Sequence, residues 1–583
     1  MSRRWLTAWL LIGTVVVALG AVAVIVGLQA RTAKSKLTAV STNIQVLQQA
    51  LADGDEDAAV LALRGLQVST EDARDATDGV LWTVAAHTPV VGRNLSAVST
   101  TASVVDTIAD DGLSPLVGPD RTLDLAGLAP KDGRIDLDAV SALSTRMETT
   151  RTVFAEQGRR IRSIDTDGLL GSVGGEIAQV QDKISSARGV VDALSTTLRL
   201  MPDMLGGSGQ RTYAVIFQNN AEIRATGGIP GAYVLVTVDR GRITLGEQGS
   251  GAGLGQLEQP VAPLTDDEVA VYSTRLGRFF QDINLTPRFS RTAELAQAFF
   301  AREDQPLDGV LSVDPVALSY VLAGTGPVAI DDGYTVGPNN VVDTLLNQSY
   351  FALRDPVAQD DFFAGAAGDI FSAVVDQPSD PQLFVAGLVR AAREHRLLLW
   401  SADAAEQRPI GTSAVGGALP AGTDTRPAIG MYLNDGTGAK MSYYLDFDTA
   451  VTRVRCLEDR QEVRLATTLV SNAPADAAQL PESVVGPGYG TDPGSMLVTS
   501  RVYLPPGGEI VSATVDGRPA AYEPATESGR TVARIPLILA PLDERRLTVV
   551  IRTAAGQTGS PVVSTTPGLR AGTHLRVDSP ACG

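Results

Sequence analysis

Histidine and cysteine, which carry much of the chemistry of enzymes and metal sites, are scarce in this sequence. The 583 residues include 3 histidines and 2 cysteines, and His87, His395 and His574 fall in three different expected domains. Their spacing matches no metal cluster and no serine–histidine pair. Gly-x-Ser-x-Gly, His-Glu-x-x-His and Gly-Lys-Ser/Thr motifs are absent as well. These absences count against the familiar hydrolase, metalloprotease and nucleotidase classes, and no cofactor is evident.

The sequence also lacks a cluster of basic residues beyond the flanks of its N-terminal apolar run. The net charge is −18, with 66 acidic against 48 basic residues. Nucleic acid is therefore not an expected partner, because binding it needs a concentrated positive face. The apolar content of 44% is enough for large cores. At ~150 residues per domain, the length allows about three or four domains.

One long apolar run stands near the N-terminus. Residues 5–29 contain no charged side chain, and as a helix they would span roughly 37 Å, enough to cross a bilayer. A cleaved signal peptide is the alternative, but its apolar core is normally shorter and an Ala-x-Ala-like site would follow. We therefore expect an uncleaved signal anchor in a single-pass membrane protein. Its N-terminus would be cytoplasmic and its bulk extracytoplasmic, although the charged flanks alone do not set the orientation.

The two cysteines, Cys456 and Cys582, both lie in the C-terminal region. A single disulfide would explain this arrangement and would agree with an oxidising compartment. Two unpaired thiols in a reducing compartment are the open alternative.

The pattern of apolar residues predicts a multidomain α+β protein. After the tip and transmembrane helix at residues 1–30, a helical stalk or bundle is expected over 31–200, where Leu37, Val40, Ile44 and Leu47 recur at helical spacing. Strands alternate with helices over 201–435, which indicates an α/β core. Short alternating strands then dominate 436–583 and predict a β-sandwich.

The segment most suggestive of a site lies in the expected α/β core. Two apolar, strand-like runs, residues 213–217 and 232–238, flank the polar, glycine-rich segment 218–231, which we interpret as a loop. Arg224 and the backbone amides of Gly227 and Gly228 could bind an anion there. The set of candidate anion- or ligand-binding residues is Asn219, Asn220, Glu222, Arg224, Gly227, Gly228 and, as a weaker member before a helix, Arg288. A purely structural loop is an equal alternative.

Several segments resemble a bacterial membrane-anchored family known only as a domain of unknown function. The main motif is Phe-Gln-Asn-Asn-Ala-Glu-Ile-Arg-Ala-Thr-Gly-Gly at 217–228. The other similar segments are residues 282–287, 307–315, 324–328 and 433–444. The resemblance covers most of the chain and implies no activity.

Residues 210–335 are more distantly similar to the LytR–CpsA–Psr envelope proteins. That resemblance implies an α/β core that holds a polyprenyl-phosphate carrier, with arginines, an aspartate and Mg²⁺ transferring a glycopolymer to the cell wall. Arg224 falls where one of those arginines would lie, but the second arginine motif is replaced by Gly-Glu-Gln-Gly-Ser-Gly at 246–251. Our leading hypothesis is therefore an envelope protein that binds or scaffolds a glycopolymer or a lipid-linked ligand. The alternatives are a phosphotransferase, for which Mg²⁺ would be the cofactor, and a purely structural assembly partner.

Overall fold

The computed structural model describes residues 56–89, 91–117, 128–330, 333–376, 378–570 and 575–582, with a few positions between 43 and 50. The chain divides into two compact units. The first comprises Met1–Gly127 and Asp138–Pro202, and the second comprises Leu128–Leu137 and Asp203–Gly583. The domain boundaries expected from the sequence stay predictions beside this division.

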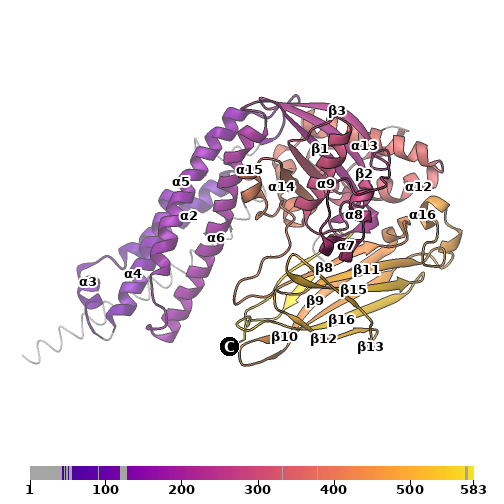
Figure 1. The fold of residues 1–583 in the computed structure, drawn as a ribbon. Helices are drawn as coiled ribbons and strands as arrows, with labels where there is room; N and C mark the ends of the chain where they lie inside the picture. The colour runs from indigo at the N-terminus through magenta and orange to yellow at the C-terminus, as the bar shows by residue number, and fades with distance from the viewer. Residues whose placement is uncertain are drawn as a thin grey trace, which may run out of the picture. The chain divides into compact units, whose positions relative to one another are not determined.

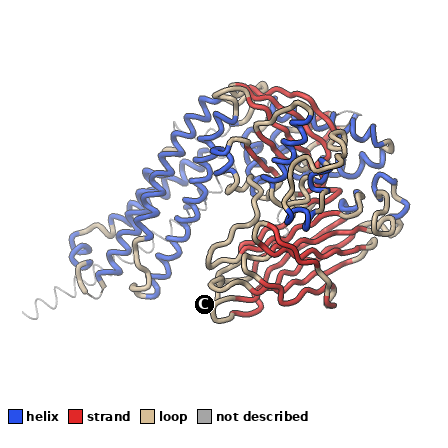
Figure 2. The backbone as a smooth tube through the Cα atoms, in the orientation of Figure 1, coloured by secondary structure: helices blue, strands red, loops and turns tan. Residues whose placement is uncertain are grey.

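The described part of the first unit is helical (Figures 1 and 2). Apolar side chains such as Val140, Leu143, Met147 and Phe154 recur at spacings of three, four and seven residues and are buried, as in an amphipathic helix. The helices are α2 (Glu56–Asp75), α3 (Val80–Ala86), α4 (Gly92–Thr107), the π-helix η1 (Ile108–Leu113), α5 (Leu137–Arg162) and α6 (Gly171–Met204).

The expected transmembrane helix is not among these elements. In the part of the chain that the structure describes, no helix is both long and apolar enough to cross a membrane. Helix α6 has 34 residues, but charged residues such as Glu176, Asp182 and Arg188 interrupt it. The fold class and membrane localisation predicted from the sequence are thus contradicted: the structure is a mixed α/β protein with several sheets. Residues 5–29, on which the prediction rested, lie outside the described residues.

A five-stranded sheet forms the centre of the second unit's first half. Its order is β3-β2-β1-β4-β7, with β1 and β4 parallel and the other neighbours antiparallel. Its strands are β1 (Arg211–Arg224), β2 (Gly227–Asp239), β3 (Arg242–Ser250), β4 (Gly309–Val313) and β7 (Leu397–Ser401).

Helices cover both faces of this sheet. Successive side chains of β1 point to opposite faces, so that β1 contributes to two cores. Ala214 and Ile216 pack in one core with α9 (Phe289–Arg302). Tyr213 and Val215 pack in another core with α10 (Pro315–Thr325) and α13 (Pro356–Asp376). The remaining elements of this half are α7 (Asp266–Tyr272), α8 (Arg275–Arg278), η3 (Phe280–Asp282), β5 (Val328–Ala329), β6 (Thr335–Val336), α11 (Val341–Asp343), η5 (Thr344–Gln348), α12 (Ser349–Ala352), α14 (Pro381–Arg393) and α15 (Ala404–Ile410).

Two mainly antiparallel sheets make up the rest of the second unit. Their strand orders are β13-β12-β16-β10-β9-β18 and β14-β15-β11-β8-β17. Their inward side chains share one core, to which Leu465 and Val549 contribute from the first sheet and Val498 and Ile535 from the second. The strands are β8 (Ala428–Asp435), β9 (Leu445–Cys456), β10 (Gln461–Ser471), β11 (Met496–Tyr503), β12 (Glu509–Val515), β13 (Arg518–Pro519), β14 (Glu523–Glu527), β15 (Arg530–Leu539), β16 (Glu544–Arg552), β17 (Val562–Thr565) and β18 (Leu575–Asp578), and the short helices are η6 (Lys440–Tyr444), η7 (Ala477–Gln479) and α16 (Glu482–Val485).

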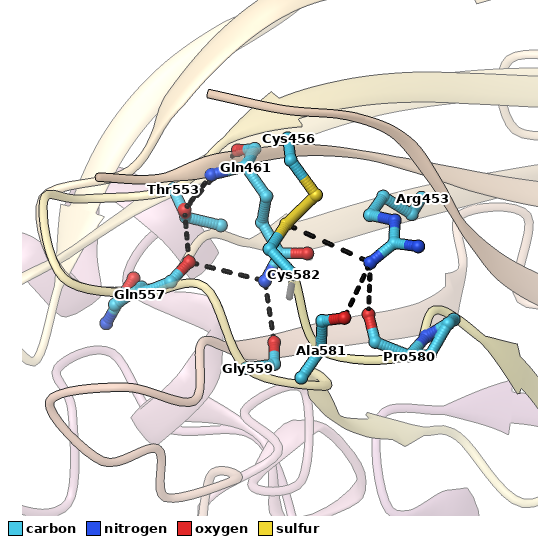
Figure 3. Close-up of a disulfide and its surroundings, with 9 residues drawn as sticks. All are labelled: Arg453, Cys456, Gln461, Thr553, Gln557, Gly559, Pro580, Ala581 and Cys582. Carbon is cyan, nitrogen blue, oxygen red and sulfur yellow. Dashed lines mark hydrogen bonds between the residues drawn. A yellow bond between two sulfur atoms is a disulfide. The ribbon is translucent and has the colours of Figure 1, made fainter. Parts of the chain in front are cut away.

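The predicted disulfide is confirmed: Cys456, at the end of β9, is bonded to Cys582 (Figure 3). Hydrogen bonds hold the C-terminal tail in place around it. The Cys582 amide donates to the Thr558 carbonyl at 2.8 Å, and Arg453 Nη1 donates to the carbonyls of Pro580 and Ala581 at 2.8 Å each. The C-terminal tail is therefore fixed to the edge of the six-stranded sheet.

Candidate functional site

The segment expected to be a polar loop is the far end of a long β-hairpin. Strand β1 runs to Arg224 and β2 begins at Gly227, so only Ala225 and Thr226 form the turn. Pairing is regular from Arg211 to Phe217 and is then interrupted twice. The second interruption leaves Asn220, Ala221 and Glu222 without a partner on β2, and an irregularity of this kind re-aims the side chains that it carries.

Two glycines allow the strands to approach closely at this end. Gly227 has a φ of +136°, in a region that favours glycine. A Cβ on Gly228 would lie 2.2 Å from the carbonyl carbon of Asn219. Neither position has room for a larger residue, so these glycines have a structural role in the hairpin.

The amides of the hairpin have internal partners. Gln218 Nε2 donates to Ser312 Oγ at 2.6 Å, and Gln218 Oε1 accepts from the Gly228 amide at 2.8 Å. Asn219 Nδ2 donates to the Tyr350 hydroxyl at 2.6 Å. Asn220 Nδ2 donates to Asp314 Oδ2 at 3.2 Å, while Asn220 Oδ1 is buried without a partner among the described residues.

Arg224 lies at the middle of a row of alternating charges. Its Nη2 is 2.6 Å from Glu222 Oε1 and 3.2 Å from Asp282 Oδ1. Lys440 Nζ continues the row at 2.6 Å from Glu222 Oε2, and Arg275 Nη2 closes it at 2.8 Å from Asp282 Oδ2. Arg224 itself is 4% exposed. Since both carboxylates bind it directly, its charge is compensated within the fold.

Burial and the neighbouring charges set the ionisation of this row. Burial alone would raise the pKa of Glu222, but Lys440 and Arg224 outweigh it and hold the pKa well below its ordinary value. Asp435 lies near the same row, and burial, followed by the Glu222 carboxylate, raises its pKa to about 6. The cluster therefore stabilises one carboxylate in its charged form and disfavours a second one.

Arg288 belongs to a different cluster. Its Nη2 is 2.7 Å from Glu268 Oε1 and its Nε is 2.9 Å from Glu527 Oε1. Glu527 also accepts hydrogen bonds from Tyr272 and Tyr503. Arg224 and Arg288 have no common partner among these contacts. The anion-binding role of both arginines stays a prediction, and the structure places each of them against two carboxylates.

Lys440, Asp282 and Asp435 belong to this site but were not among the residues predicted for it. They could have been found, because all three lie in segments that resemble the family of unknown function, 282–287 and 433–444, and these segments meet at the hairpin. Asn284 Nδ2 donates to the Gly228 carbonyl at 2.7 Å, and the Ala225 amide donates to Asn434 Oδ1 at 3.2 Å. Their convergence marks this region as the most elaborate polar site that we find in the described chain.

An apolar pocket adjoins the hairpin on the side of α13. The pocket has a volume of about 40 Å³ and is partly open to solvent. Apart from Gln218 and Asn219, every residue that lines it is apolar or glycine, namely Phe217, Gly231, Ala232, Pro315, Leu318, Leu345, Leu346, Phe363, Ala366, Ala367 and Ile370. The amide groups of Gln218 and Asn219 are occupied by internal hydrogen bonds, so the pocket offers mainly apolar contacts.

Metal ligation finds no support in the described ranges, in which no three histidine, cysteine or carboxylate side chains are grouped to hold an ion. The expectation that the protein needs no cofactor stays a prediction, as does the Mg²⁺ that the phosphotransferase alternative would use.

One segment of the chain matches a known protein family. Residues 208–350 match the family described as a protein of unknown function (DUF4012), which confirms the expected similarity to a domain of unknown function for this part of the chain. No curated protein matches the chain. A crystal structure of the transcriptional regulator yvhJ from Bacillus subtilis is similar at 12% identity and a TM-score of 0.20, over 37% of this chain and 83% of that one. The similarity to LytR–CpsA–Psr proteins stays a prediction.

Proposed function

We propose that the chain acts by binding, and that its α/β half holds part of the apolar chain of a lipid-linked glycan of the cell envelope. The observation that carries this proposal is the apolar pocket between the hairpin and α13. Ligand sites combine an apolar lining with a few polar groups. A volume of about 40 Å³ suits a short section of an apolar chain, with the remainder of the ligand lying outside.

The hairpin supports a binding role over a catalytic one. A phosphotransferase would need Arg224 to contact the phosphate, but Glu222 and Asp282 bind its guanidinium in a buried position. Moving Arg224 to a phosphate would break its charge-assisted bonds to both carboxylates, each worth about 1.5–3 kcal/mol. Glu222 would then keep only Lys440, and Asp282 only Arg275. No observation in the described residues favours the phosphotransferase, and we put forward no second function.

The proposal is tested with farnesyl phosphate as the probe and inorganic phosphate as its chain-free control. Phe363 lines the pocket and is half-buried. Phe363→Ala should weaken farnesyl phosphate binding roughly five- to tenfold, because it removes about 1–1.5 kcal/mol of apolar contact. Titration calorimetry with the full chain measures the change.

The matched control is Phe371→Ala, which changes another half-buried phenylalanine of α13 outside the pocket. This variant should bind farnesyl phosphate as the unchanged protein does. Equal weakening by both variants, binding of inorganic phosphate as tight as that of farnesyl phosphate, or no binding of farnesyl phosphate would each refute the proposal.

A further inference from the structure

A groove lies on the outer face of the six-stranded sheet, far along the chain from the hairpin. It has a volume of about 250 Å³. Ala450 of β9 and Ala466 and Thr468 of β10 form its floor, and Asp448, Arg546 and Arg576 border it. Thr449 and Leu575 complete the lining. The groove therefore has small side chains at its base and a mainly polar rim with one apolar residue, whereas the pocket beside α13 is mainly apolar.

The strand register explains the shape of this groove. Arg576 on β18 pairs with Ala450 on β9, which pairs with Ala466 on β10. One step further along, Asp448 pairs with Thr468, which pairs with Arg546 on β16. Paired residues point to the same face of a sheet. The two middle strands therefore present Ala450, Ala466 and Thr468 to the groove, with an arginine on each outer strand. The arginine positions are three strands apart across the sheet and two residues apart along it, which is roughly 16 Å at about 4.8 Å per strand and about 3.3 Å per residue.

The two arginines are available to a ligand. Both are exposed, and among the described residues neither guanidinium has an ion pair or a hydrogen bond. Of the carboxylates, Asp448 faces Arg570, whose Nη2 is 3.3 Å from Asp448 Oδ2. The rim thus has two uncompensated positive charges and one carboxylate that is already paired.

The chemistry of the lining selects the ligand class. Arginine binds carboxylate, sulfate and phosphate groups through charge-assisted hydrogen bonds. Thr468 can donate and accept, and Asp448 can accept, which suits hydroxyl groups. The small side chains of the floor leave room for a chain that lies across the strands. We propose that this groove binds a segment of an acidic glycan.

This inference goes beyond the function proposed for the α/β half. It concerns another sheet, other residues and the polar part of a ligand. Either proposal can therefore fail while the other holds.

The experiment measures binding of polygalacturonate to the full chain, with dextran as a neutral glycan and polyglutamate as an acidic peptide. The double variant Arg546→Gln/Arg576→Gln should weaken polygalacturonate binding about tenfold or more, because it removes two charge-assisted contacts. Ala466→Trp should weaken it as much by filling the floor without changing the charge. The control Arg518→Gln alters an exposed arginine on β13 of the same sheet, outside the groove, and should leave binding unchanged.

Three results would overturn the inference. The first is that polygalacturonate does not bind, or binds no better than dextran. The second is that polyglutamate binds as tightly, which would mean that charge alone is recognised. The third is that Arg518→Gln weakens binding as much as the groove variants do. Ala466→Trp keeps the test decisive if the double variant does not fold, as judged by circular dichroism.

Discussion

The charged residues buried around Arg224 explain why the motif at 217–228 is so polar. A charge in a protein interior is tolerated when it is paired and hydrogen-bonded. Glu222 meets two cations, Arg224 and Lys440, while Asp282 meets Arg224 and Arg275. Each carboxylate therefore balances two cations, and removing Glu222 would leave Lys440 without its counter-charge.

Glu222→Gln should destabilise the protein by about 3–5 kcal/mol, because Lys440 and Arg224 would each lose a counter-charge in a buried site. Denaturation by urea measures the loss. The control is Glu509→Gln, which breaks an ion pair with Arg552 at a position where the carboxylate is 70% exposed. That change should cost about 1 kcal/mol or less. Similar losses in the two variants would show that the row contributes no more than a surface pair.

Asp435 should make stability depend on pH in the opposite sense from an ordinary paired carboxylate. Its pKa is raised from 3.8 to about 6 in the fold. Between about pH 4 and pH 6 the folded state therefore binds more protons than the unfolded state, and stability falls as the pH rises through that window. Asp435→Asn should remove this decline.

The measurement for Asp435 is the free energy of unfolding across that pH window, in the unchanged protein and in Asp435→Asn. The difference between them should move in favour of the variant with rising pH. Glu222, whose pKa is lowered, acts the other way, since its contribution is lost as the pH falls below its ordinary pKa. Two parallel stability curves would contradict the assignment to Asp435.

At the scale of elements, the hairpin shows what sequence patterns can and cannot predict. The runs at 213–217 and 232–238 are apolar and rich in β-formers, and both lie in strands of the central sheet. The segment between them resembles a loop because its side chains are polar. The segment nevertheless continues both strands. Its polar side chains can be buried there because groups from distant parts of the chain form hydrogen bonds with them.

Two of these partners show why the sequence pattern does not predict the contacts of this segment. Ser312 lies 94 residues from Gln218, and Lys440 lies 218 residues from Glu222. Local composition reports the polarity of a segment but not the groups that will satisfy it. The cysteine pair was predictable because only two cysteines exist. The row of charges around Arg224 was not predictable, because its members come from three separate stretches of the chain, 222–224, 275–282 and 440.

The close approach of β1 and β2 makes Gly228 a sensitive position in the hairpin. In Gly228→Ala, the new methyl group would lie 2.2 to 2.4 Å from backbone atoms of Asn219 and Asn220, so the irregular part of β1 would have to shift. We expect a loss of about 3 kcal/mol. In the control Gly337→Ala the nearest atoms lie 3.9 and 4.0 Å away, and the effect should stay within about 1 kcal/mol. Urea denaturation compares the two, and equal midpoints would argue against a tight hairpin.

At the scale of the whole second unit, the central sheet and the two facing sheets are joined through their cores. Ile223 of the hairpin packs in the core of the facing sheets. In return, Tyr432 and Tyr503 of those sheets pack in the core beneath α9. Lys440 adds an ion pair across the same junction. Because shared apolar cores and an ion pair join the two halves of this unit, we expect the unit to unfold as a whole.

The disulfide constrains that unit at its end. Cys456 and Cys582 are separated by 126 positions, and closing a loop of this length reduces the entropy of the unfolded chain by an amount worth about 4–5 kcal/mol in the loop-entropy model. The double variant Cys456→Ser/Cys582→Ser should therefore lose about 2–5 kcal/mol. Reductant should lower the unfolding midpoint of the unchanged protein to that of the variant and leave the variant unaffected. If reductant leaves the unchanged protein's midpoint where it was, the bond contributes little, and the hydrogen bonds of Arg453 and the Cys582 amide are what hold the tail.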